Sequence, residues 1–144
     1  MDRGFVEKNK ASTDRLRKLV AGLKDGDMSR RVGANWTVAV ALAHLAFWDR
    51  RVQFVLDRTA QAGKLSPVEI DTTANDVMLP ALELIPGRDA ARLAIETAEA
   101  LDRQLESFDE GLLDQINTYN PRWVTRALHR NEHLDEVDKA LRGS

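Results

Sequence analysis

The 144-residue sequence contains no cysteine and has no excess of positive charge. Without cysteine the chain cannot form disulfides, a thiolate zinc site or an iron–sulfur cluster, and it has no catalytic cysteine of its own. Its 21 lysines and arginines are outnumbered by 23 aspartates and glutamates, and the sequence pI is near 5.9. Proteins that bind the phosphate backbone of nucleic acids carry an excess of positive charge, so we expect no nucleic-acid partner.

Long hydrophobic runs are scarce as well. The first ten residues include Asp2, Arg3 and Glu7, so they lack the apolar core of a secretory signal. The uncharged stretch at 32–48 is shorter than the roughly 20 apolar residues of a membrane span. We therefore expect a cytoplasmic protein with no membrane partner. Length and composition predict a single soluble domain over residues 1–144.

Apolar residues at spacings of three and four predict an all-α fold built on four long helices. Four helices are predicted. The first starts between Phe5 and Ser12 and ends near Gly26, and the second has Thr37 as N-cap and an apolar pattern that runs from Trp36 and thins toward Leu56, before the connection that begins at Ala62. The third follows Gly87 and runs through Phe108, and the fourth runs from about Pro121 to Leu141. For the fourth helix, Asn120 and Pro121 are typical of an N-cap followed by the first helical position.

The connections between these helices predict the topology. Residues 25–35 are expected to form a loop and residues 109–116 a polar turn with a helical piece, so the helices on either side of each should be antiparallel neighbours. Residues 62–86 are long enough to cross the molecule and return, and are expected to contain one short helix. The prediction is a four-helix bundle of up-down-down-up topology with a long crossover between helices two and three.

The three histidines all fall in predicted helices that should face each other: His44 in the second, His129 and His133 in the fourth. A spacing of four residues rotates the second side chain by only about 40° from the first, so His129 and His133 project from one stripe. The apolar neighbours of His44 direct its imidazole toward the interior, where it can supply a third nitrogen. Three imidazoles without a thiolate favour zinc, nickel, iron or copper over magnesium or calcium.

Each of these features also has a purely structural interpretation. A histidine on an apolar face, such as His44, is commonly a hydrogen-bonded core residue. His129 and His133 lie among Arg126, Arg130 and other polar residues, which is also the pattern of a polar surface. Residues 129–133 match H-x-x-E-H, the inverted zinc-protease motif, but that motif needs a further ligand downstream and only 11 residues follow His133.

Two segments carry a resemblance to a known family: WTVAVALAHLAFWD at 36–49 and LHRNEHLDEV at 128–137. Through them the chain, from about Leu16 to Leu141, resembles the DinB-like superfamily, and more narrowly the branch grouped with the N-terminal domain of mycothiol-dependent maleylpyruvate isomerase. The resemblance implies an up-down-down-up four-helix bundle. It also implies a divalent metal, commonly zinc or nickel, held by His44, His129 and His133.

The chain departs from the isomerase type in two ways. Isomerase-type members carry a further C-terminal domain that helps to hold the thiol cofactor, and this chain stops at the fourth helix, so use of a thiol stays open. The isomerase has a glutamate as the first ligand of the last helix, whereas this chain has His129, as most of the superfamily does. Relatives in the family include dimers, so a homodimer is compatible with the resemblance.

Two glutamates and one arginine are further candidates for the site. Glu132 and Glu136 lie on the helix of the histidine pair and could act as acid or base near the metal, or could be solvated surface charges. Arg51, two turns from His44, could anchor a small anionic substrate or cofactor, or could form a salt bridge.

Three tryptophans are also candidates. Trp36, Trp48 and Trp123 could line a pocket, with Trp48 binding substrate, or could fill the core. Asn75 lies in the crossing segment, from which it could approach the mouth of such a pocket.

Two classes of function stay open. The first is a metal-dependent enzyme, a thiol transferase, isomerase or hydrolase, in which a metal-bound thiol or water reacts with a small electrophile. Because the chain has no cysteine, the thiol would be a low-molecular-weight one such as mycothiol, bacillithiol or glutathione. The second is a non-enzymatic, stress-associated helical bundle for binding or dimerisation, with a structural or vestigial metal site.

Overall fold

The computed structural model describes residues 1–143 and is mostly helical, with one small hairpin, which confirms the predicted all-α class. Its elements are the α-helices α1 (Phe5–Gly22), α2 (Val38–Ala62), α3 (Ala74–Leu82), α4 (Gly87–Ser107), α5 (Glu110–Tyr119) and α6 (Ala127–Arg142), the short 3-10 helices η1 (Asp25–Ser29) and η2 (Pro121–Trp123), and the strands β1 (Arg31–Val32) and β2 (Trp36–Thr37). Ser144, the last residue of the predicted domain, lies outside the described residues.

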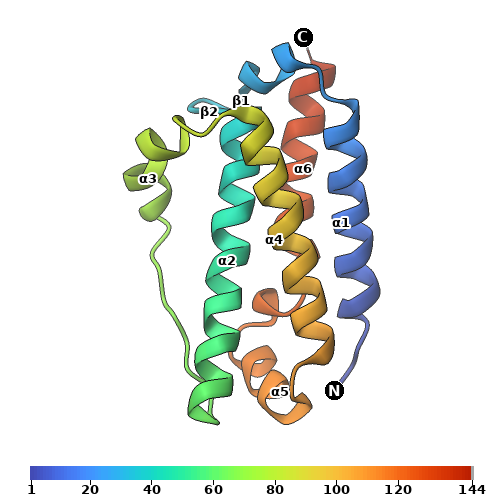
Figure 1. Ribbon diagram of the computed structural model, residues 1–144, viewed down its shortest axis with the longest axis vertical. Coiled ribbons are helices and arrows are strands. Elements are labelled where there is room, and N and C mark those ends of the chain that lie inside the picture. Colours follow the sequence, from blue (N-terminus) through green and yellow to red (C-terminus); the bar gives the residue numbers. More distant parts are fainter. Residues whose placement is uncertain (144) are drawn as a thin grey trace.

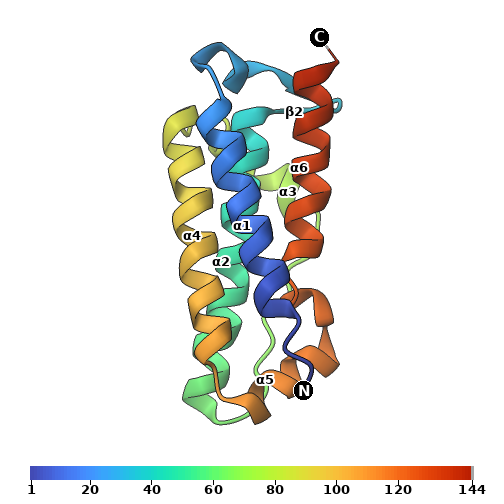
Figure 2. The same ribbon diagram turned by 90° about the vertical axis from the view of Figure 1, so that its right-hand side faces the viewer.

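Four long helices, α1, α2, α4 and α6, lie side by side along the long axis of the molecule (Figures 1 and 2). In the view of Figure 1 the chain ascends in α1 and α6 and descends in α2 and α4. Between α2 and α4 it returns along the outside of α2 through residues 63–73 and the short helix α3, which stands beside α2.

Helix α2 is the most deeply buried helix, because its apolar run faces α4 on one side and α6 on another. Thr37 caps it as predicted: the Thr37 hydroxyl accepts from the Val40 N–H at 3.2 Å. Gly63 ends it in the left-handed conformation, at φ 68°. The facing side of α4 carries small buried side chains that allow the two helices to approach closely, and these are Ala90, Ala91, Ala94 and Ala98.

The segment predicted as a loop at 25–35 holds η1 and strand β1, which pairs with β2 in an antiparallel hairpin. Gly33, at φ 67°, provides the left-handed residue of the turn. Strands of two residues are too short to show a period of two in the sequence, so the hairpin was not predicted. Its second strand delivers Trp36 to the start of α2.

Two predicted helix ends are wrong. The first helix ends at Gly22 and not near Gly26, because Leu23 turns to an extended conformation and its N–H bonds to the Val20 carbonyl. The fourth long helix begins at Ala127 and not at Pro121. The Asn120 side chain does accept from the Arg122 N–H, at 3.1 Å, but it caps the short helix η2. The expected helical piece at 109–116 is α5.

Within residues 1–143, no helix has both the length and the apolar character needed to cross a membrane.

Candidate metal centre

Three imidazoles converge between α2 and α6. His44 comes from the second turn of α2, and His129 and His133 come from the first two turns of α6. The Nε2 atom of His44 lies 3.1 Å from Nε2 of His133 and 3.3 Å from Nε2 of His129. One nitrogen from each ring lies within 4.8 Å of the other two, so the structure brings together the three residues that the sequence singled out.

The spacing of these nitrogens fits a single metal ion. Two nitrogens that each lie about 2.0–2.1 Å from a zinc ion at a tetrahedral angle are about 3.3–3.4 Å apart. The observed separations of 3.1 and 3.3 Å are close to that edge length. Because all three donors are nitrogens, the set suits zinc, nickel, iron or copper and not magnesium or calcium.

The electrostatic environment keeps the imidazoles neutral, which metal binding requires. Burial lowers the pKa of His44 to about 3, with a further contribution from His133. The pKa of His129 is lowered as well, first by burial and then by the charge of Arg126. Burial also lowers the pKa of His133, although the carboxylates of Glu136 and Glu132 act against the shift.

Outer contacts orient two of the rings. The Glu136 carboxylate accepts a hydrogen bond from Nδ1 of His133 at 2.8 Å, which leaves the Nε2 lone pair directed at the centre. The Arg126 guanidinium donates to Nδ1 of His129 at 3.1 Å, so a neutral His129 carries its proton on Nε2 in this structure; to bind a metal ion as a neutral ligand through Nε2, it would have to carry the proton on Nδ1 and release Arg126. The Trp36 ring packs 4.4 Å from the ring of His44, measured between centroids.

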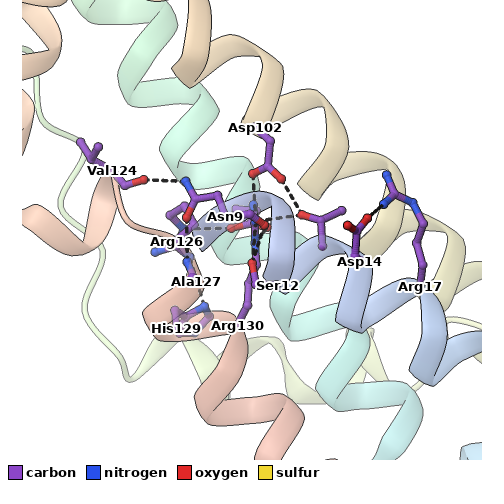
Figure 3. A network of polar contacts seen from close by, with 12 residues as sticks. Asn9, Ser12, Asp14, Arg17, Asp102, Val124, Arg126, Ala127, His129 and Arg130 are labelled. Atoms are coloured by element: carbon purple, nitrogen blue, oxygen red, sulfur yellow. Dashed lines mark hydrogen bonds and ion pairs between the residues drawn. The ribbon is translucent and has the colours of Figure 1, made fainter. Parts of the chain in front are cut away.

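Arg126 belongs to a buried network of charges that sequence reasoning missed (Figure 3). Asp49 accepts from Arg126 at 2.9 Å and from Arg130 at 3.0 Å, and Arg130 also pairs with Asp102 at 2.9 Å. Arg126 and Arg130 are only 3% and 1% exposed, so they do not form the polar surface that was considered for this stretch. Two carboxylates and two guanidinium groups balance each other, which permits their burial.

The centre opens into a pocket of about 310 Å³. Besides the three histidines, its lining includes Trp48, Asn75 and three arginines, whereas no aspartate or glutamate of residues 1–143 lines it. Arg122 and Arg126 each pair with a carboxylate outside the lining. The pocket is therefore electrostatically suited to an anion.

Arg51 is held in this pocket between two indole rings. Its guanidinium carbon lies 4.9 Å from the centroid of Trp48 and 4.7 Å from that of Trp123. Its Nη1 donates to the Val68 carbonyl at 3.1 Å, and no carboxylate among the described residues forms an ion pair with it. Trp48 is fixed in turn, because its indole N–H donates to Asn75 at 2.9 Å. The structure thus provides a rigid cation without a paired anion.

The two candidate acid–base residues lie outside the pocket lining. Glu132 binds Arg122 through both carboxylate oxygens, each at 3.0 Å, and is largely exposed. Glu136 contacts His133 on the side away from the convergent nitrogens. Their predicted catalytic roles stay predictions.

The fold and the site define a helical protein in which three histidines of two long helices meet at one point. Residues 10–131 match the family described as the mycothiol maleylpyruvate isomerase N-terminal domain, and the chain belongs to this DinB-like family. The match confirms the resemblance stated from the sequence. It includes His44 and His129 and ends two residues before His133. No curated protein and no solved structure matches the chain.

Proposed function

We propose that this protein is a metal-dependent enzyme that holds one divalent ion, zinc or nickel, with His44, His129 and His133. The convergence of the three Nε2 atoms carries this proposal. Three neutral ligands leave the ion its full charge and at least one open coordination position, as in catalytic and not in closed structural zinc sites. Such an ion acidifies a bound water or thiol and so supplies a nucleophile near neutral pH.

The reaction we propose is transfer of a low-molecular-weight thiol to a small electrophile, or hydrolysis of that electrophile. The family description includes mycothiol, which supports a thiol. The chain has no cysteine, so any thiol comes from solution. Mycothiol, bacillithiol and glutathione each carry the free thiol group that this reaction requires. A thiol transferase, an isomerase and a hydrolase are all compatible with this centre.

Arg51 and Trp48 are the substrate-binding residues in this proposal. The Arg51 guanidinium is stacked between Trp48 and Trp123, and it lines the same pocket as the histidines. It can bind a carboxylate or another anionic group of a small molecule while the reacting atom faces the metal. The indole of Trp48, held by Asn75, covers one face of this arrangement.

Glu132 and Glu136 are the proposed acid–base residues. Glu136 hydrogen bonds to His133, so its first effect is to orient that ring and raise its basicity. Glu132 would need to leave Arg122 before it could exchange a proton with a ligand in the pocket. Of the two, Glu136 is thus the better supported as part of the centre.

The proposal includes a molecular context. We infer that the four long helices form an up-down-down-up bundle and that residues 1–144 are one domain, because the long helices pack in neighbouring pairs around shared core clusters. A cytoplasmic location, a homodimer and the lack of a nucleic-acid partner are further expectations from the sequence and the family.

One observation favours the non-enzymatic alternative. No carboxylate of the described residues lines the pocket, so no general base stands beside the metal position. In that case the chain would be a stress-associated binding or dimerisation module, and the metal would serve its structure.

Titration of the Co²⁺-loaded protein with thiols separates the two functions. Binding of glutathione, bacillithiol or mycothiol to the ion as thiolate changes the visible absorption of Co²⁺. The enzyme proposal predicts this change with at least one of the three, followed by loss of thiol when a small electrophile is added. A spectrum that none of the thiols alters, together with no hydrolysis of activated esters, would contradict it.

A further inference from the structure

Helix α6, which carries two of the three histidines, begins without a cap of its own. Its N-cap residue, Arg126, makes no capping bond through its side chain. His129 is the third residue of the helix and lies in its first turn. The first N–H groups of a helix have no partner within the helix, so an uncapped first turn frays. Something outside α6 must therefore hold the turn that presents His129.

Asn9 of α1 supplies that cap from across the molecule. Its side-chain oxygen accepts from the N–H of Ala127, the first residue of α6, at 2.9 Å. Its side-chain nitrogen donates to the carbonyl of Val124, just before the helix, also at 2.9 Å. Asn9 is only 1% exposed, and Figure 3 shows both bonds. One side chain of α1 thus binds the chain on both sides of the point where α6 begins.

An asparagine is specifically suited to this position. A backbone N–H can only donate and a carbonyl oxygen can only accept, so the two partners require an acceptor and a donor on one short side chain. Aspartate would keep the bond to Ala127 and lose the bond to Val124. Alanine would lose both and leave two backbone groups buried without partners.

The same residue is tied to the buried charges behind the centre. The backbone carbonyl of Asn9 accepts from Nη1 of Arg130 at 3.3 Å. Arg130 and Arg126 both pair with Asp49, and Arg126 in turn contacts His129. The position of α1 is thereby linked to the orientation of the His129 ring by two routes, the backbone of α6 and this network.

We propose that Asn9 is a positioning residue of the metal centre: it fixes the start of α6 and so the place of His129 relative to His44. Helix α1 contributes no metal ligand, yet on this proposal it is needed for metal affinity. The proposal rests on the proposed role of the three histidines as ligands. It adds a residue, 120 positions before His129 in the sequence, to the machinery that holds the ion.

The test compares two substitutions on α1. Asn9→Ala removes the cap. Leu16→Ala is the matched control, because Leu16 is as deeply buried on the same helix, packs in the apolar core and has no polar side-chain atom that could hydrogen bond to α6. Two quantities are measured: the exchange rate of the Ala127 amide in the metal-free protein, and the affinity for Zn²⁺ in competition with a chelator.

Asn9→Ala is expected to speed exchange of the Ala127 amide at least tenfold and to weaken Zn²⁺ binding by about tenfold or more, the size typical of outer-contact residues. Leu16→Ala is expected to lower the melting temperature while leaving both quantities within about threefold of wild type. Equal effects of the two substitutions, or no effect of Asn9→Ala, would overturn the proposal.

Two further substitutions of Asn9 complete the test. Asn9→Asp, which retains the acceptor for Ala127, should restore amide protection. Asn9→Ser, whose hydroxyl is too short to reach both partners, replaces Asn9→Ala if that variant does not fold. If the wild type binds no Zn²⁺, the proposed metal function fails, while the exchange rates still decide whether Asn9 positions His129.

Discussion

The Nε2 atoms of His44 and His133 lie 3.1 Å apart, although 89 positions separate the two residues in the sequence. Two ring nitrogens at this distance share either a proton or a metal ion. Nδ1 of His133 lies 2.8 Å from the Glu136 carboxylate, which favours a proton on Nδ1 and leaves the Nε2 lone pair directed at His44. A third nitrogen, from His129, approaches the same point. This arrangement supports the proposal that the three histidines bind one metal ion.

Replacement of Arg51 should weaken the binding of anionic ligands. Arg51→Lys retains the charge but loses the planar group that stacks between Trp48 and Trp123, so the affinity for a small carboxylate should fall by about tenfold, or about 1.4 kcal/mol. Calorimetric titration measures it. Arg50→Lys, on the neighbouring residue outside this pocket, serves as the control. Equal losses in both variants would contradict a specific role of the Arg51 guanidinium in anion binding.

Replacement of Glu136 should lower metal affinity without unfolding the protein. Glu136→Ala removes the acceptor that orients His133, and the loss of such a contact typically weakens metal binding by 10- to 100-fold. Glu132→Ala, on the same helix but bound to Arg122, should change the affinity less than threefold. Chelator competition gives both values. If Glu132→Ala has the larger effect, the assignment of the two glutamates is reversed.

The stability of the metal-free protein should fall as the pH is lowered from about 6.5. An unfolded histidine titrates near its ordinary pKa of about 6.5, whereas burial lowers the pKa of His44 to about 3 in the folded protein. Between pH 3 and pH 6.5 the unfolded state binds more protons than the folded state. The free energy of unfolding is therefore highest above about pH 6.5 and decreases as the pH falls toward about 3. His44 changes the free energy of unfolding by up to about 1.4 kcal/mol per pH unit, and His129 increases this slope.

Urea unfolding in the presence of a chelator measures this dependence. The window from pH 7.5 to 5.5 is the most informative, because few carboxylates titrate there. His44→Gln should have a shallower slope than wild type. A free energy of unfolding that is constant over this window would show that folding does not lower the pKa values of the histidines.

Replacement of Asp49 should destabilise the fold more than replacement of any surface acid. Asp49→Asn leaves Arg126 and Arg130 as buried cations with reduced compensation, which typically costs about 3–5 kcal/mol. Asp135→Asn, which removes an exposed ion pair to Arg15, should cost less than about 1 kcal/mol. Denaturant titration of both variants gives the comparison. Similar small losses would mean that Asp49 does not stabilise the network.

The sequence predicted the all-α class and three ligand candidates because both depend on local periodicity. Four-residue spacing places His129 and His133 on one stripe whatever the rest of the chain does. The start of α6 could not be predicted in this way, because its cap is Asn9, a residue of another helix. The local signal at Asn120 is real, but it starts the short helix η2.

The buried charges were missed for a related reason. Arg126 and Arg130 lie in a stretch of polar residues, and only distant partners, Asp49 and Asp102, permit their burial. Arg126 and Arg130 are four residues apart, as His129 and His133 are, and this spacing was the one signal in the sequence for their burial. It indicates a second stripe on α6 that also faces inward.

The metal content of protein purified without a histidine tag tests the central claim most directly. We expect about one first-row transition metal ion per chain in the wild type, and near zero in His44→Ala and His129→Ala, with both variants folded by circular dichroism. Asn131→Ala, between the two α6 histidines, should retain the metal. A folded wild-type protein that contains no metal and takes up none from equimolar Zn²⁺ or Ni²⁺ would contradict the account.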